Sequence, residues 1–188
     1  MPKWFRRFAE IPGVDYPGSQ GVKRSRLKWH DAVPRSVGGF LSWPSGSSAS
    51  PAHEQAFKQD DKSIAEALNR VSEALELPGE PVDYHFAIQG VAEFIRKHHR
   101  EDPSALSEME RLAWLDLRLV EACPECVSFD GRYVRILAFA ILVDLYTEEG
   151  FIREALEVAE RAQRFQAVEI DIDDLRQRIA RIESEHVG

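Results

Sequence analysis

Apolar residues recur at helical spacing through most of the chain after residue 50. Ile64, Leu68, Val71 and Leu75 are separated by four, three and four positions, which places them on one face of a helix. We expect one helix or two between about 51 and 77, and further helices at about 82–99, 102–122, 132–148, 151–166 and 172–186. No segment shows a convincing strand pattern. Because short links favour antiparallel neighbours, the pattern predicts an all-α fold of antiparallel helical hairpins, an α-solenoid-like bundle.

Capping signals support several of these boundaries. Ser50 before Pro51 is typical of an N-cap followed by proline at the first helical position. Ser63 and Glu66 have the spacing of a capping box. The last helix begins among carboxylates, which suit the positive end of a helix dipole: Asp171, Asp173 and Asp174.

Residues 1–50 differ from the rest of the chain. Glycine and proline occur there at short intervals, so only a short helix fits, at about Lys3–Glu10. The segment is nevertheless rich in large aromatic side chains: Trp4, Phe5, Phe8, Tyr16, Trp29, Phe40 and Trp43. Since disordered tails are poor in aromatics, we expect it to dock on its own body or on a partner. The chain thus divides into an irregular N-terminal arm (1–50) and an α-helical domain (51–188).

The charge is distributed unevenly between these two parts. Residues 1–50 contain eight Lys/Arg and three Asp/Glu, a balance of +5, whereas residues 51–188 contain sixteen and twenty-nine, a balance of −13. An acidic domain repels phosphate groups and does not favour broad contact with nucleic acid.

One segment has a more specific pattern, in which aromatic, aliphatic and small residues alternate over two helices: Phe139, Leu142, Val143, Tyr146, Gly150, Ile152, Ala155, Ala159 and Ala162. This segment, about 136–167, resembles a single degenerate tetratricopeptide repeat. In such a repeat Ala155 and Ala162 are small where the helices cross, and Phe139, Leu142 and Tyr146 fill the space between them. Gly150 permits the tight turn with positive φ. The sequence departs from the family at Val143, where glycine is usual, at Ala159, where a larger apolar residue is usual, and at Ala167, where proline is common.

The resemblance implies a scaffold that binds proteins or peptides on a concave face lined by the first helix of each pair. Arg135 and Asp144 are the candidate polar positions on that face. The basic and asparagine residues of the family's peptide clamp are not recognisable, so the resemblance implies no specific ligand. The helix at 172–186 is expected to close the hairpin as a cap.

Cys123 and Cys126 have the spacing of half a zinc site. His85, His98 and His99 are the available candidates for further ligands, but the chain has no second CxxC pair. Redox chemistry at a CxxC motif requires a βαβ context, which the sequence lacks. We favour a helix terminus with two small, partly buried cysteines, and predict no metal or cofactor.

Other catalytic patterns are absent from the sequence. Gly38-Gly39 is not followed by the Lys-Ser/Thr of a phosphate-binding loop, and no serine or cysteine lies in a nucleophile elbow. The acidic pairs lie at expected helix ends and on solvated faces. We therefore expect that the protein is not an enzyme, and keep a small metal-dependent enzyme around the two cysteines as a minor hypothesis.

The arm contains a basic cluster beside a tryptophan, formed by Lys23, Arg24, Arg26, Lys28 and Trp29. Such a cluster can contact acidic protein, nucleic acid or an anionic membrane surface, aided by Trp4 and Phe8. Four or five cations give weak specific binding alone, so contact with protein, in its own or another copy, is favoured.

These observations predict a non-enzymatic protein–protein interaction module, an adaptor or structural subunit with a docking arm. The alternative is a nucleic-acid-associated regulatory or assembly protein that uses the arm on phosphate. No apolar stretch reaches the roughly 18 residues of a membrane span, and the first ten residues lack the apolar centre of a secretory signal. The two cysteines are too few for a disulfide scaffold, so a cytoplasmic setting is expected.

Overall fold

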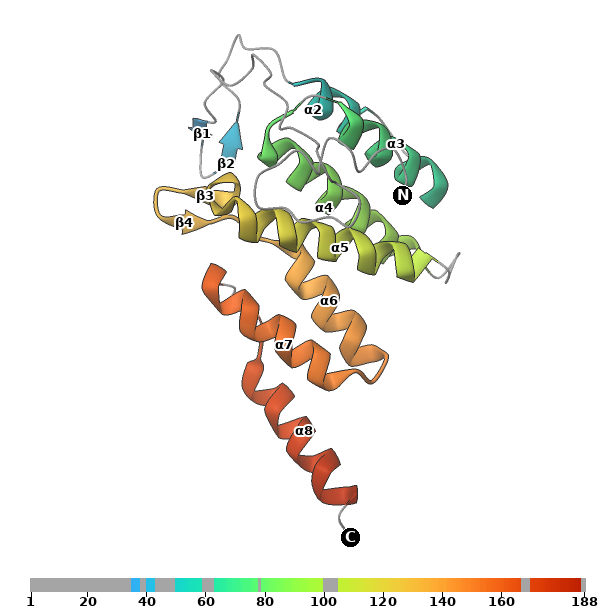
Figure 1. Ribbon diagram of the computed structural model, residues 1–188, viewed down its shortest axis with the longest axis vertical. Coiled ribbons are helices and arrows are strands. Elements are labelled where there is room, and N and C mark those ends of the chain that lie inside the picture. Colours follow the sequence, from blue (N-terminus) through green and yellow to red (C-terminus); the bar gives the residue numbers. More distant parts are fainter. Residues whose placement is uncertain are drawn as a thin grey trace, which may run out of the picture.

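A computed structural model describes residues 35–37, 40–42, 50–58, 63–77, 79–99, 105–166 and 170–186 (Figure 1). The all-α prediction is confirmed, because these ranges contain seven α-helices and only four strands of two or three residues. The helices are α2 (Pro51–Ala56), α3 (Ile64–Glu76), α4 (Pro81–His98), α5 (Ala105–Ala122), α6 (Leu137–Glu148), α7 (Ile152–Ala162) and α8 (Ile172–His186). Two 3₁₀ turns follow α5 and α7: η2 (Pro124–Val127) and η3 (Gln163–Phe165).

Side-chain caps explain why the stretch from 51 to 77 forms two helices. The Ser50 hydroxyl accepts a hydrogen bond from the His53 amide at 3.0 Å, with Pro51 at the first helical position. The Ser63 hydroxyl accepts a second such bond from the Glu66 amide at 3.2 Å. Each cap satisfies an amide that has no partner inside its helix.

The helices succeed one another along the long axis of the molecule, from α2 and α3 at one end to α8 at the other (Figure 1). Each helix from α2 to α8 packs against the next one in sequence. In addition, α2 contacts α4, and α4 contacts α6. The assignment of α6 and α7 to a repeat hairpin stays a prediction.

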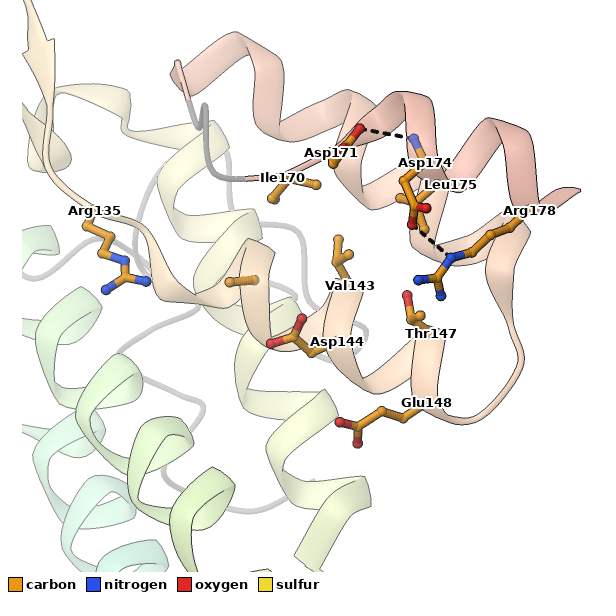
Figure 2. Close-up of a pocket in the computed structure, with 11 residues that line it drawn as sticks. Arg135, Val143, Asp144, Thr147, Glu148, Ile170, Asp171, Asp174, Leu175 and Arg178 are labelled. Carbon is orange, nitrogen blue, oxygen red and sulfur yellow. Dashed lines mark hydrogen bonds and ion pairs between the residues drawn. The ribbon is translucent and has the colours of Figure 1, made fainter.

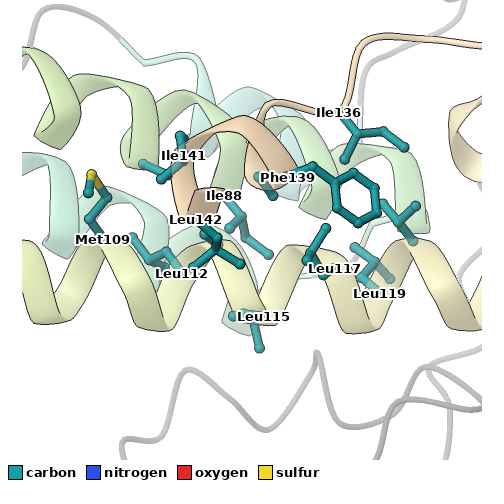
Figure 3. Close-up of a cluster of buried hydrophobic side chains, with 14 of the residues drawn as sticks. Ile88, Met109, Leu112, Leu115, Leu117, Leu119, Ile136, Phe139, Ile141 and Leu142 are labelled. Atoms are coloured by element: carbon teal, nitrogen blue, oxygen red, sulfur yellow. The ribbon is translucent and has the colours of Figure 1, made fainter. Parts of the chain in front are cut away.

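The core is continuous through the stack, and its centre lies where α4, α5 and α6 meet (Figure 3). Ile88 of α4, Leu112 of α5 and Phe139 of α6 are fully buried there. The apolar face of α5 is buried, including the one carboxylate within it, Asp116. Burial of these faces is the main favourable contribution to folding.

The expectation that the chain has no strand is wrong. β1 (Arg35–Val37) pairs antiparallel with β2 (Phe40–Ser42), and β3 (Ser128–Phe129) pairs with β4 (Arg132–Tyr133). Asp130 and Gly131 have φ of 49° and 73°, the conformation of a type I′ hairpin turn, which the Asp-Gly pair favours. Strands of two or three residues are too short to produce a period-two pattern.

Two helix boundaries also differ from the prediction. α6 begins at Leu137 rather than at 132, because Arg132 and Tyr133 belong to β4. α7 ends at Ala162, and the turn η3 leads to Gln166, which has a left-handed conformation with φ of 55°. The bounds predicted for α8 are confirmed.

Most of the arm lies outside the described residues, including the short helix expected at 3–10 and the aromatic side chains at its start. Within 1–50 the structure describes β1, β2 and Ser50. The division of the chain at residue 50 therefore stays a prediction. None of the helices in the described ranges combines the length and apolar composition that a bilayer span requires.

Gly79 permits the close approach of α2 to the start of α4. A Cβ atom at this position would lie 2.6 Å from the Cβ of Ala52 and 3.2 Å from the Ser50 hydroxyl. That hydroxyl donates a hydrogen bond to the buried Asp83 carboxylate at 2.7 Å, and the same carboxylate accepts the Glu80 amide at 2.8 Å. These contacts fasten α2 to the body of the protein.

The substitution Gly79→Ala is expected to destabilise the fold by about 1–3 kcal/mol, because the added methyl group forces α2 away from α4. Gly90→Ala is the matched control, since Gly90 lies exposed on α4 and a Cβ there meets no atom within 4 Å. That control should stabilise the protein by about 0.5–1 kcal/mol through helix propensity. Urea unfolding followed by circular dichroism measures both, and equal midpoints for the two variants would contradict the close packing of α2.

Candidate functional site

A cleft of about 460 Å³ lies between α6 and α8 (Figure 2). Its apolar part includes Val143 of α6 and Leu175 of α8, both buried, together with Ile170 just before α8. The lining residues are Arg135, Ala140, Val143, Asp144, Thr147, Glu148, Ile170, Asp171, Asp174, Leu175 and Arg178. The volume falls within the range of ordinary ligand sites.

The cleft has an excess of negative charge. Four carboxylates and two arginines line it, a formal balance of −2. The Arg178 guanidinium donates to Asp174 at 2.8 Å, and Asp171 accepts the Asp174 amide at 3.0 Å at the start of α8 (Figure 2). The α6 side contributes Asp144 and Glu148, with Arg135 in the segment before the helix, and Arg178 on the α8 side is already paired with Asp174.

The environment of Asp144 favours a nearby cation. Burial raises the pKa of this carboxyl above its usual range, and the neighbouring Glu148 raises it further. Arg96 of α4 opposes the shift and lowers the pKa. The net shift of the Asp144 pKa is upward, so Arg96 does not fully offset the effects of burial and of Glu148 on the ionised carboxylate. A second cation in the cleft would stabilise the ionised form.

Thr147 adds a hydroxyl group without a hydrogen-bond partner. Its Oγ1 atom is buried, and no acceptor or donor among the described residues pairs with it. A threonine within a helix commonly bonds back to the preceding turn, which would satisfy this group internally. An unsatisfied buried hydroxyl is unfavourable, so a bound polar group that reaches Thr147 would gain a hydrogen bond.

Both polar residues predicted for a binding face line this cleft. Arg135 is exposed in the segment before α6, and Asp144 is exposed on α6 (Figure 2). What the cleft binds is untested by this placement. The other predicted partner-binding residues lie outside the described residues: Trp4, Phe8, Lys23, Arg24, Arg26, Lys28 and Trp29.

Sequence reasoning missed that Glu148, Asp171 and Asp174 share one cleft, because it assigned them to separate solvated helix ends. Asp144, Thr147 and Glu148 are three and four positions apart, so they occupy one face of α6. That spacing was the available signal for the α6 wall. The contribution of α8 depends on a long-range contact that no local pattern encodes.

Most of the residues named for repeat packing are buried where α6 and α7 meet. Phe139, Leu142, Ala155 and Ala162 are fully buried. Gly150 has φ of 85°, which confirms the predicted positive φ. The repeat assignment itself is untested by these positions.

Tyr146 has a polar role that the sequence did not indicate. Its hydroxyl donates to Glu110 at 2.6 Å and accepts the Trp114 indole N–H at 2.8 Å, so it links α6 to α5. Partial burial and the bond to Glu110 raise the pKa of Tyr146 to about 12. On the same surface Arg161 lies 4.9 Å over the Trp114 ring and makes two bonds to Glu121, at 2.9 and 2.6 Å.

A buried hydrogen bond between His85 and Asp116 joins α4 to α5. The His85 Nδ1 atom lies 2.7 Å from Asp116 Oδ1, and neither side chain is more than 1% exposed. His85 Nε2 and Asp116 Oδ2 are buried without a partner among the described residues. A substrate in solution cannot reach this pair, so we assign it to the core rather than to catalysis.

The two cysteines occupy the same region of the core. Both are buried, and no disulfide joins them. Burial, reinforced by the Asp116 charge, raises the pKa of the Cys126 thiol. Within the described residues no group of three or more His, Cys, Asp or Glu side chains is placed to hold a metal ion.

The histidines considered as zinc ligands make other contacts. His98 stacks on Phe94 with ring centroids 4.4 Å apart, and His99 Nδ1 lies 2.8 Å from the Arg96 carbonyl.

Comparison with known proteins gave no match to a family model, a curated protein or a solved structure.

Removal of one member of the buried pair should be far more damaging than removal of both. Asp116→Leu leaves the His85 imidazole buried without its acceptor, a loss of about 3–5 kcal/mol in unfolding free energy. The double variant His85→Leu/Asp116→Leu replaces the pair by apolar groups and should recover most of that loss. Urea titration of both single variants and the double variant measures the coupling, and additive losses would refute it.

The cysteines should resist thiol reagents in the native protein. The raised pKa of Cys126 keeps the thiolate fraction low, and an opening free energy of about 3 kcal/mol alone slows labelling roughly 100-fold. Because the unfolded thiol ionises at lower pH than the folded one, stability should fall as pH rises above the ordinary thiol pKa. Labelling with Ellman's reagent at pH 8, with and without guanidinium, measures the protection of the thiols. Rapid labelling of the native protein would contradict that protection.

Proposed function

We propose that this chain is a non-enzymatic protein- or peptide-binding module, an adaptor or a structural subunit of a larger assembly, which binds through the α6–α8 cleft. The observation on which the proposal depends is the cleft itself. It combines an apolar floor at Val143 and Leu175 with charged groups at its edges and the Thr147 hydroxyl, which no other described residue pairs with. Such a combination suits a peptide with both cationic and apolar side chains.

The resemblance to a tetratricopeptide repeat supports the same surface. In that family the first helix of each pair lines the concave binding face, and α6 is the first helix of the proposed pair. Arg135 and Asp144 are the polar positions that the resemblance implies for that face, and both line the cleft.

A binding role also agrees with the chemistry of the lining. Catalysis requires a nucleophile or a base positioned against a reacting group. The ionisable side chains of the cleft are carboxylates and arginines on helix surfaces, and Arg178 is paired with Asp174. The buried His85–Asp116 pair lies away from solvent.

The alternative function, association with nucleic acid, would use the basic cluster of the arm at 23–29, which lies outside the described residues. The cleft does not support that alternative, because its four carboxylates repel phosphate groups. We therefore place the principal contact on a protein or peptide partner.

Charge reversal on the α6 wall tests the proposed function. The variant Asp144→Arg/Glu148→Arg should retain at least about tenfold less of its partner from native cell extract than the wild-type full chain does. Glu154→Arg/Glu157→Arg is the matched control, because it makes the same charge change at exposed positions on α7. Quantitative mass spectrometry of the captured proteins gives the readout, after circular dichroism has shown equal helix content.

The expected result is a protein retained by the wild type and by the control variant but lost from the cleft variant. Identical retention by all three proteins would contradict the proposed function.

A further inference from the structure

The charge and shape of the cleft match a segment of this chain itself. The segment Lys23–His30 contains four Lys/Arg and no Asp/Glu, and Leu27 and Trp29 lie between and beside the cations. The cleft has a formal balance of −2 and an apolar floor. Within the segment, cationic and apolar residues alternate over 26–29, so in an extended conformation the cations can meet the carboxylates while Leu27 and Trp29 meet Val143 and Leu175.

The α6 wall provides the strongest part of this complementarity. Asp144 and Glu148 lie one turn apart on the exposed side of the helix, the spacing at which two cations of an extended peptide can each approach one carboxylate. Although much of the Asp144 side chain is exposed, burial of part of its carboxyl raises the pKa, so nearby cations favour the ionised form. The Thr147 hydroxyl between the two carboxylates is unpaired among the described residues.

The segment is close enough in the chain to reach the cleft. Outside the β1–β2 pair, the chain from His30 to Ser50 advances by 13 residue-to-residue steps, five from 30 to 35 and eight from 42 to 50. At about 3.3 Å each, these steps span up to about 43 Å. Packed helices are about 8–10 Å apart, and α2 contacts α4, which contacts α6. Two such steps amount to about 20 Å between the axes of α2 and α6, which is less than the span of the arm.

We infer that the α6–α8 cleft is the docking site of this chain's own basic segment Lys23–His30, which competes there with any external partner. The inference rests on the proposed function, because it takes the cleft to be a peptide-binding surface. Attachment through the arm gives the segment an effective concentration on the order of millimolar. Even a weak contact would thus keep the cleft occupied, and a partner must displace the segment.

Competition with a synthetic peptide tests the inference in the full chain. The probe is a fluorescently labelled peptide of residues 23–30, and its binding is followed by fluorescence anisotropy. The arm-neutral variant replaces all four cations of the segment by glutamine: Lys23→Gln, Arg24→Gln, Arg26→Gln and Lys28→Gln. This variant should bind the peptide at least about tenfold more tightly than the wild type, in which the segment already occupies the cleft.

Two further variants place the peptide on the cleft. Asp144→Asn/Glu148→Gln, added to the arm-neutral chain, should weaken peptide binding at least about tenfold. Glu154→Gln/Glu157→Gln on α7 removes the same charge elsewhere and should leave binding within about twofold.

Disulfide trapping separates docking within one chain from docking between two. The variant Ser25→Cys/Glu148→Cys, oxidised at low protein concentration, should yield a cross-linked monomer on a non-reducing gel, whereas Ser25→Cys/Glu157→Cys should not. The native cysteines are buried and serve as an internal background. A cross-linked dimer would assign the cleft to the arm of a second copy and would overturn docking within one chain.

The outcomes separate this inference from the proposed function. Equal peptide affinity in the wild type and the arm-neutral variant, or no binding to either, overturns docking of the arm. The proposed function survives those results if the charge-reversal variant still loses a captured partner that the α7 control retains. The proposed function fails, whatever the peptide assay shows, if no captured protein requires Asp144 and Glu148 for its retention.

Discussion

The burial of α6 is the constraint on which the rest of the structure depends. α6 packs against α4, α5 and α7, and six of its residues are buried: Ala138, Phe139, Ile141, Leu142, Val143 and Leu145. A helix that is apolar over most of its circumference must be covered on several sides. The strip that remains exposed contains Asp144 and Glu148. One face of α6 therefore contributes to the core and another lines the cleft. Burial of the core face determines where the cleft face lies.

Polar contacts between neighbouring helices set how the apolar faces are aligned. Ser50 and Asp83 join α2 to α4, His85 and Asp116 join α4 to α5, and Tyr146 joins α6 to α5. Apolar packing alone tolerates small rotations and sliding of one helix on another, whereas a hydrogen bond requires one geometry. These bonds lie at successive junctions of the stack. Together they favour a single alignment from α2 as far as α6.

The helices were predictable from sequence because their apolar stripes and caps are local features. Ile64, Val71 and Leu75 form a stripe within one helix, and the Gly150 turn and the start of α8 depend on adjacent residues. The β3–β4 pair was missed because two-residue strands have no detectable period. The Asp-Gly pair at 130–131 favours a hairpin turn, and the strands paired around it delay the start of α6 to Leu137.

The candidate site was only partly predictable, for a different reason. Arg135 and Asp144 were found through a family pattern confined to one segment, whereas the α8 wall adds Asp174, Leu175 and Arg178 from a later helix. The His85–Asp116 pair joins residues 31 positions apart. No local period links such residues, because their proximity results from the packing of whole helices.

The two walls of the cleft differ in how firmly they are held. The α6 wall belongs to the core, but α8 has a single buried side chain among its described residues, Leu175, while Ile182 is 41% exposed. Exposed ion pairs join α8 to α7, Arg153–Glu183 at 2.7 Å and Arg176–Glu160 at 3.0 Å. Such pairs contribute little each and are screened by salt. A rise in ionic strength therefore weakens part of the attachment of α8 and leaves the apolar attachment of α6 unscreened.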